Sequence, residues 1–190
     1  MRVCVVGTGN IGRTLARCFS QSGITVAFAS RHPEHTAIDG LTVTGIDQGL
    51  AEADVVVLAL PGSAAGEFLT THRQALADLL VVDATNNVGA AKMHHAEQAA
   101  GLSYCRAFNT LGVENFADPE YAEGRADLFY SGPPQRRAEV EVLIAAVGLH
   151  PIYVGDGVAA ADVLDGVTRL WFTLALNQGL GRHLAFRTVR

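Results

Sequence analysis

The chain opens with MRVCVVGTGNIG, residues 1–12, and this stretch decides the fold. Residues 2–7 are a short valine-rich run, typical of a strand buried in a parallel sheet. Gly7, Gly9 and Gly12 then follow in GxGxxG spacing. In this motif the first glycine permits a tight turn, the second lets a pyrophosphate approach the main chain, and the third lets a helix pack closely on the sheet. Because the motif follows a strand and opens a helix, it predicts a dinucleotide-binding loop.

Apolar runs and helix-like segments alternate along the chain. Strands that are apolar along their whole length are expected in a parallel sheet covered on both faces, so the alternation predicts an α/β, doubly wound Rossmann fold. The predicted strands are 2–7, 24–30, 41–45, 54–60, 79–85, 104–108, 127–132 and 150–155. The predicted helices are 10–22, 47–52, 62–77, 90–100, 134–147 and 158–178.

The last predicted helix, 158–178, has a broad apolar face with Val163, Val167 and Leu170 at helical spacing. Such a face packs on a core, closes a ligand pocket or forms a dimer interface. We expect a dinucleotide-binding Rossmann domain at 1–155 and a small helical C-terminal lobe at 156–190. The helix carries more apolar surface than a short lobe covers, so we also expect a homodimer.

Composition narrows the class of protein. Of 190 residues 49% are apolar and 17% charged, which allows a substantial core, and the net charge of −5 argues against a nucleic-acid partner. No secretory signal is visible, and no apolar run approaches the roughly 20 residues that span a bilayer. The three cysteines fit neither a zinc site nor a CxxC pair. We therefore expect a cytoplasmic protein with no membrane partner and no bound metal.

The segment FASRHP, residues 28–33, lies where the second strand of a dinucleotide-binding fold ends. An acidic residue usually stands there, where it accepts a hydrogen bond from the 2′-hydroxyl of NAD. Here Ser30, Arg31 and His32 offer donors instead. Ser30 and Arg31 suit the 2′-phosphate of NADP, since a guanidinium binds phosphate in a two-pronged geometry. His32 either adds a contact or occupies the turn before Pro33.

Polar side chains also follow other predicted strands. Ligands of open α/β sheets lie at the carboxyl ends of strands. Leu60 and Pro61 form an apolar turn suited to packing beside a nucleotide, and Thr85, Asn86 and Asn109 offer groups for a nicotinamide carboxamide and an acceptor pocket. Ordinary capping and turn chemistry is the alternative explanation for the asparagines. Asn109 is the one candidate catalytic residue.

No acid or base is conspicuous among the predicted site residues. His94 and His95 lie in the predicted helix 90–100, where we expect a solvated face. Hydride transfer to a flavin-like ring chiefly needs two stacked rings, whereas reduction of a simple ketone more often needs a donor side chain. In that second case the candidates are Tyr104, Asp162 or a water bound to Asn109.

Several motifs together resemble the NADP-dependent F420 oxidoreductase family. They are MRVCVVGTGNIGRTLA, ASR, VVDATNN, RAFNTLGVENF and the later LGRHLAF. The resemblance implies a Rossmann domain whose small C-terminal lobe covers a hydride-acceptor pocket. It also implies hydride exchange between NADP(H) and coenzyme F420, with the 2′-phosphate at Ser30 and Arg31. The implied NADP loop comprises Gly7, Thr8, Gly9, Asn10, Ile11 and Gly12.

A second resemblance leaves the acceptor open. DATNN, AFNT and RLWFTL are similar to the cytosolic oxidoreductase domain of the six-transmembrane-epithelial-antigen metalloreductases, which pass electrons from NADPH to a flavin. The acceptor is accordingly F420 or a flavin (FAD or FMN), or else a small carbonyl or imine compound of a biosynthetic pathway. A third hypothesis is a non-catalytic NADP(H)-binding sensor.

Overall fold

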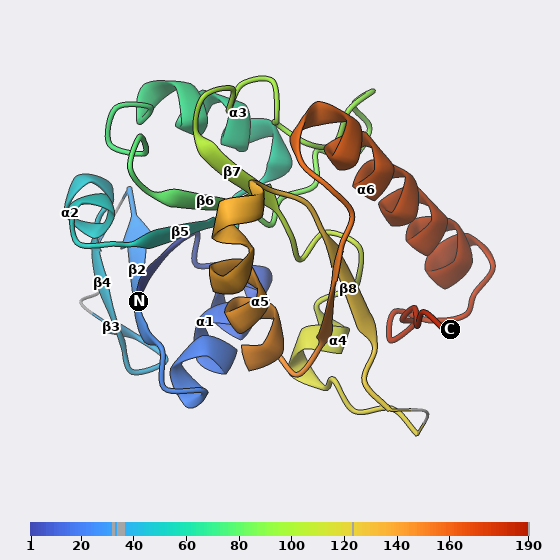
Figure 1. Ribbon diagram of the computed structural model, residues 1–190. Helices are drawn as coiled ribbons and strands as arrows, with labels where there is room; N and C mark the ends of the chain where they lie inside the picture. Colours follow the sequence, from blue (N-terminus) through green and yellow to red (C-terminus); the bar gives the residue numbers. More distant parts are fainter. Residues whose placement is uncertain (32, 34–36, 123, 190) are drawn as a thin grey trace.

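A computed structural model describes residues 1–31, 33, 37–122 and 124–189 (Figure 1). A mixed seven-stranded sheet forms its centre, with strand order β3-β4-β2-β1-β5-β6-β7. Every neighbouring pair is parallel except β3 and β4. The predicted α/β doubly wound fold is thus confirmed. The strands are β1 (Arg2–Val6), β2 (Thr25–Ser30), β3 (Ala37–Ile38), β4 (Leu41–Gly45), β5 (Val55–Leu58), β6 (Leu80–Asp83) and β7 (Ser103–Arg106).

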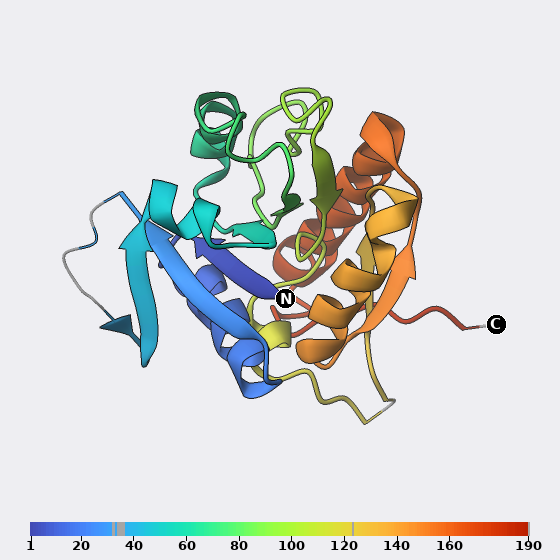
Figure 2. The same cartoon turned by 60° about the vertical axis from the view of Figure 1, so that its left-hand side comes forward.

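Helices cover both faces of the sheet (Figures 1 and 2). They are α1 (Asn10–Gln21), α2 (Ile46–Ala51), α3 (Gly62–Thr71), α4 (Glu114–Ala117), α5 (Arg137–Ala146) and α6 (Gly157–Phe172), with a 3₁₀ turn at Pro134–Arg136 and a π-helical turn at Thr173–Asn177. Alternate residues of β1 enter different cores, because side chains of a strand point to opposite faces in turn. Val3 and Val5 pack in the core with Phe19, whereas Cys4 and Val6 pack in the core with Leu69.

A second, two-stranded parallel sheet pairs β8 (Asp127–Tyr130) with β9 (His150–Tyr153). Two main-chain hydrogen bonds between Arg106 and Ser131 join it to the end of β7. Beyond β9, α6 places Trp171 in the same core as β1, and the following turn adds Ala175. The domain boundary between residues 155 and 156 stays a prediction.

The prediction of a helix at 90–100 is wrong, because turns occupy this segment. Two main-chain N–H groups of this segment donate to side chains and not to the carbonyls of a helix. That of Met93 donates to Asp165 (2.6 Å), and that of His95 donates to the Tyr104 hydroxyl (3.2 Å). Tertiary contacts therefore override the local preference. His94 and His95 are buried, at 4% and 5% exposure, so the expected solvated face is also wrong.

The predicted helix at 62–77 is shorter than expected. Regular α3 ends at Thr71, and irregular turns continue to residue 79. Across the described residues, none of the helices combines the length and the apolar character needed to cross a bilayer.

Candidate functional site

The glycine loop between β1 and α1 is a close-packed turn with one open side. Gly7 has φ +117°, and a methyl group there would overlap the carbonyl oxygen of Ala59. A methyl group on Gly12 would overlap the carbonyl oxygen of Gly7. A Cβ on Gly9 would meet nothing within 4 Å. The first and third glycines are thus needed by the fold, while the second leaves space beside the main chain where a phosphate fits.

The start of α1 presents unpaired donors beside that space. Gly9 is the N-cap and no side chain caps the helix, so the N–H groups of the first turn stay available. Asn10 and Ile11, both exposed, form this turn. A helix N-terminus of this kind favours an anion through its N–H groups and its dipole. The main chain of Thr8, in the loop before the helix, is held in place because its carbonyl oxygen accepts a hydrogen bond from Arg13 Nε at 3.0 Å.

The residues expected to choose the coenzyme lie at the neighbouring strand end. β2 pairs directly with β1, and Ser30 is its last residue, one position beyond the pair Val6 and Ala29. Arg31 follows and is exposed. Both therefore lie at the same carboxyl edge as the glycine loop. The predicted contact of His32 falls outside the described residues.

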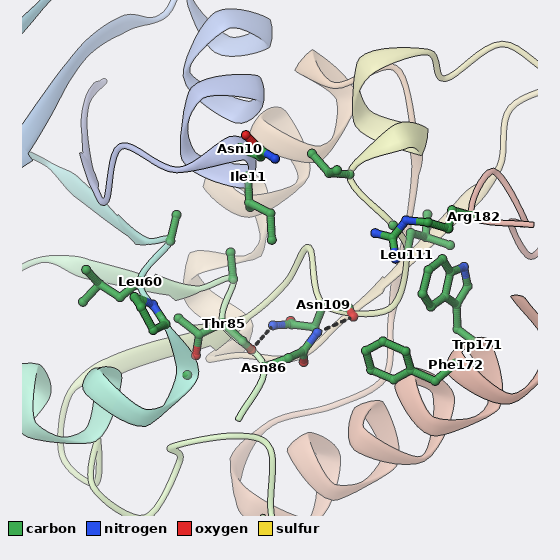
Figure 3. A pocket seen from close by; sticks show the side chains of 16 residues that line it. Asn10, Ile11, Leu60, Thr85, Asn86, Asn109, Leu111, Trp171, Phe172 and Arg182 are labelled. Atoms are coloured by element: carbon green, nitrogen blue, oxygen red, sulfur yellow. Dashed lines mark hydrogen bonds between the residues drawn. The ribbon is translucent and has the colours of Figure 1, made fainter. Parts of the chain in front are cut away.

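A cavity of about 380 Å³ lies at this edge, where β5, β6 and β7 end (Figure 3). It brings together predicted residues from four separate parts of the sequence. Its walls are Asn10, Ile11, Ala59, Leu60, Pro61, Gly62, Ala84, Thr85, Asn86, Asn109, Leu111, Gly112, Val113, Trp171, Phe172 and Arg182.

Asn109 stands in this cavity with a fixed amide orientation. Its Nδ2 donates to the carbonyl oxygens of Asp83 (3.1 Å) and Thr85 (2.8 Å), and an oxygen in that place would be repelled by both. Its Oδ1 is therefore turned the other way, and it is buried without a partner in the described structure. The same holds for Thr85 Oγ1. Two orphaned polar atoms on lining residues are what a bound amide would satisfy, since buried polar groups are nearly always paired.

Asn86 and Arg106 hold the loops that follow β6 and β7, which carry Thr85 and Asn109. Asn86 Nδ2 donates to the carbonyl oxygen of Asn109 at 3.0 Å. The fully buried Arg106 donates to the Thr85 carbonyl (2.9 Å), to Asn86 Oδ1 (2.9 Å) and to Asp165 Oδ1 of α6 (2.8 Å). The guanidinium thus ties the ends of β6 and β7 to the C-terminal helix. Such secondary contacts hold a binding site in one geometry.

The far wall of the cavity is aromatic and belongs to the C-terminal region. Trp171 and Phe172 end α6, and Trp171 Nε1 donates to the carbonyl oxygen of Leu184 (2.8 Å). Gly112 lies against this wall, because an added Cβ would come within 2.8 Å of the Arg182 carbonyl oxygen and 2.9 Å of Trp171 Cζ2. The sequence predicted that the C-terminal region, including Trp171, would line the pocket, but it did not single out Gly112, Phe172 or Arg182. The signals were the apolar face of helix 158–178 and the motifs RLWFTL and LGRHLAF.

The lining residues, all of which are described, include no carboxylate, imidazole, phenol or thiol. Tyr104 and Asp162, the acids considered above, lie elsewhere. The Tyr104 hydroxyl donates to Asp83 Oδ2, and burial, reinforced by the Asp83 charge, raises the pKa of Tyr104 well above its ordinary value. Asp162 is paired with His94 at 2.9 Å. Neither contributes a proton donor to the cavity.

Comparison with known proteins shows similar coenzyme-binding folds. Residues 2–87 match the family described as NADP oxidoreductase, coenzyme F420-dependent. A glycerol-3-phosphate dehydrogenase [NAD(P)+] from Pseudomonas aeruginosa is 28% identical over 108 residues, which are 46% of this chain and 31% of that protein. The chain thus spans about a third of the length of this curated relative.

Solved structures resemble the chain over a longer range. A crystal structure described as a candidate F420-dependent NADP reductase, from Arthrobacter sp. FB24, is 24% identical with a TM-score of 0.82, covering 100% of both chains. An imine reductase from Streptomyces aurantiacus is 21% identical with a TM-score of 0.67, covering 95% of this chain and 65% of that one. These likenesses establish the Rossmann-type fold of the reductases. The resemblance predicted from the sequence is confirmed: residues 2–87 carry the pattern of the coenzyme F420-dependent NADP oxidoreductase family, whose members and relatives are NAD(P)-dependent oxidoreductases.

Proposed function

We propose that this protein is an NADP(H)-dependent oxidoreductase that exchanges a hydride between NADP(H) and a planar acceptor, coenzyme F420 or a flavin. The observation that carries the proposal is the cavity. It runs from the glycine-loop helix at Asn10 and Ile11 to an aromatic wall at Trp171 and Phe172, and its lining has no acid–base side chain. This is the arrangement expected where two ring systems react and the protein supplies position and shape.

The residues present fit NADP(H). The open side of Gly9 and the unpaired N–H groups of α1 suit the pyrophosphate. Ser30 and Arg31 follow the neighbouring strand and would bind the 2′-phosphate. A carboxamide carries one NH₂ group and one carbonyl oxygen. Asn109 Oδ1 accepts only, so it would take the NH₂, and Thr85 Oγ1 would donate to the carbonyl.

The absence of an acid in the lining favours a ring acceptor over a carbonyl. When bound, the nicotinamide supplies a hydride to the acceptor or takes one back, and a ring nitrogen of the acceptor exchanges one proton with solvent. Reduction of a ketone oxygen instead needs a donor held at the reacting atom. The one charged lining residue is Arg182, whose guanidinium offers hydrogen-bond donors and not a general acid. Of the donors that the carbonyl reductase hypothesis offered, only a water bound to Asn109 would lie at the cavity.

Turnover of NADPH with a panel of acceptors tests the proposal. Oxidised F420, FMN and FAD should each be compared with simple ketones and cyclic imines under anaerobic conditions. Loss of the visible absorption band of F420 or of the flavin, matched by NADPH consumption, supports the proposal. Turnover of imines or ketones alone would replace it with the carbonyl or imine reductase. Tight NADPH binding with no turnover of any acceptor would favour the sensor.

Homodimerisation stays a separate proposal. Val163 and Leu170 lie one heptad apart on α6 and are 55% and 50% exposed, which is unusual for large apolar side chains on one helix face. Light scattering at several protein concentrations should give twice the mass of the 20.0 kDa chain. The mass of one chain at every concentration would contradict it.

A further inference from the structure

The C-terminal segment places one cation in the wall of the cavity. Arg182 is the single charged side chain among the lining residues. It is 49% exposed, and in Figure 3 its guanidinium extends toward Leu111 and the interior of the cavity. Its charge is paired with the Glu114 carboxylate, and the guanidinium carbon lies 5.7 Å from the centre of the Trp171 ring. Nothing in the coenzyme site described above uses this charge.

The main chain around Arg182 is held firmly on several sides. Asn115 Nδ2 donates to the carbonyl oxygen of Arg182 at 3.0 Å. The preceding Gly181 N–H donates to Ala175 at 3.0 Å, and the carbonyl oxygen of Leu184 accepts from the Trp171 indole. The residue is thus anchored to α4, to the end of α6 and to the aromatic wall. A guanidinium placed in this way is preorganised and loses little freedom when it binds a ligand.

The guanidinium keeps binding capacity after its protein contact is made. Its Nε donates to Glu114 Oε1 at 2.5 Å, and no hydrogen bond within the described chain uses either terminal nitrogen. Glu114 orients the group from one side, while the two terminal nitrogens remain as a pair of donors. Paired N–H groups of arginine match the oxygens of a phosphate or a carboxylate.

We propose that Arg182 is a specificity-determining residue that selects acceptors carrying a phosphate or carboxylate group beside the ring system. This inference rests on the proposed function and deepens it, because it names the class of acceptor. FMN and F420, whose side chains carry such groups, bind through Arg182. Riboflavin has the ring system of FMN without its phosphate, and it lacks this contact.

The test compares two matched pairs of acceptors: FMN with riboflavin, and F420 with the same deazaflavin lacking its phosphate-bearing side chain. In Arg182→Gln the preference in kcat/KM for the anionic member should fall about 10- to 100-fold, the size of a charge-assisted hydrogen bond. Arg182→Lys should keep part of the preference. Arg187→Gln removes the same charge from an exposed position of the same segment, and it should leave the preference unchanged.

Binding measurements separate this inference from the proposed function. Quenching of flavin fluorescence gives the affinities of FMN and riboflavin whether or not NADPH is oxidised. If no acceptor is turned over but FMN still binds through Arg182, the proposed reaction fails and the selectivity stands. An FMN to riboflavin ratio that Arg182→Gln leaves unchanged would overturn the inference. The inference would also be overturned if Arg182→Gln lowered only the affinity for NADPH, because Arg182 would then bind the coenzyme and not the acceptor.

Discussion

Arg106 of β7 donates a hydrogen bond to Asp165 of α6 at 2.8 Å, and neither side chain has more than 2% of its surface exposed. The pair joins the sheet edge that carries the predicted carboxamide site to the helix that ends in Trp171. Asp165→Ala removes one of the two carboxylates beside this buried guanidinium, because Asp83 Oδ2 also lies 3.6 Å from Arg106. It also leaves the Met93 N–H without its acceptor, so it should lower the free energy of unfolding by about 3 kcal/mol. Denaturant titration of the variant and of the unaltered protein measures this difference in the free energy of unfolding.

A matched control lies one turn away on the same helix. Asp162 pairs with the side chain of His94, but it is 50% exposed. Asp162→Ala should therefore cost about 0–1 kcal/mol. Equal losses in the two variants would show that the Arg106–Asp165 pair has no special role.

Arg31 should account for most of the preference for NADPH over NADH. A charge-assisted contact to the 2′-phosphate corresponds to about 10- to 150-fold in affinity, and Arg31→Ala should erase most of this gap by weakening NADPH alone. Calorimetric titration of both coenzymes measures it. Arg17→Ala, at an exposed position farther along α1, is the control for net charge. Equal affinities of NADPH and NADH for the unaltered protein would refute the prediction.

The glycines of the loop should separate folding from binding. Gly9→Ala meets no protein atom within 4 Å and has φ −77°, so its free energy of unfolding should stay within about 1 kcal/mol while NADPH affinity falls. Gly12→Ala would press on Gly7 and should cost about 1–3 kcal/mol of stability. Thermal unfolding with and without NADPH distinguishes the two. If Gly9→Ala binds NADPH as tightly as the unaltered protein, the pyrophosphate does not bind against this loop.

Low pH should loosen the C-terminal segment. Burial acts to raise the pKa of Asp127, but hydrogen bonds from Thr188 and His150 outweigh it, so the pKa lies below its usual value. A carboxylate with a lowered pKa in the folded state stabilises it above the unfolded pKa of about 3.9, and this contribution disappears as pH falls through the lower, folded value.

Trp171 reports this change, because it is the single tryptophan and its indole contacts Leu184 in the same segment. Its fluorescence should change in the acid range, below about pH 4. In Asp127→Asn the segment should already be loosened at neutral pH and the acid step should shrink. An identical acid step in both proteins would show that another group is responsible.

Local motifs predicted the geometry of the sheet edge where we propose that the coenzyme binds. Gly7, Gly9 and Gly12 lie within six residues, and their spacing alone specifies a turn and a helix start that the structure contains. The strand ends at Thr85 and Asn109 were found in the same way, because parallel strands finish at one edge. The proposed coenzyme contacts of these residues remain predictions.

The part of the cavity where we propose that the acceptor binds depends on contacts between distant parts of the chain. Arg106 meets Asp165, 59 positions away, and no local pattern announces this pair. The same long-range contacts explain the wrong prediction of a helix at 90–100, since Asp165 takes the N–H of Met93. Arg182 reaches the cavity only because Trp171 and Asn115 fix the returning segment. Sequence periodicity predicts single helices and strands, but it does not predict contacts between segments this far apart in the chain.

The most direct measurement of the central claim follows the hydrogen itself. NADPH deuterated at C4 on one face or the other is mixed anaerobically with oxidised F420 and the protein, and the reduced deazaflavin is examined by mass spectrometry. Because the reduced position of a deazaflavin is a carbon, deuterium transferred as deuteride is retained there. The account predicts one deuterium in the reduced F420 from one of the two labelled coenzymes. Absence of reduction of F420, FMN and FAD in every preparation that binds NADPH, or reduction of F420 with hydrogen drawn only from solvent, would contradict it.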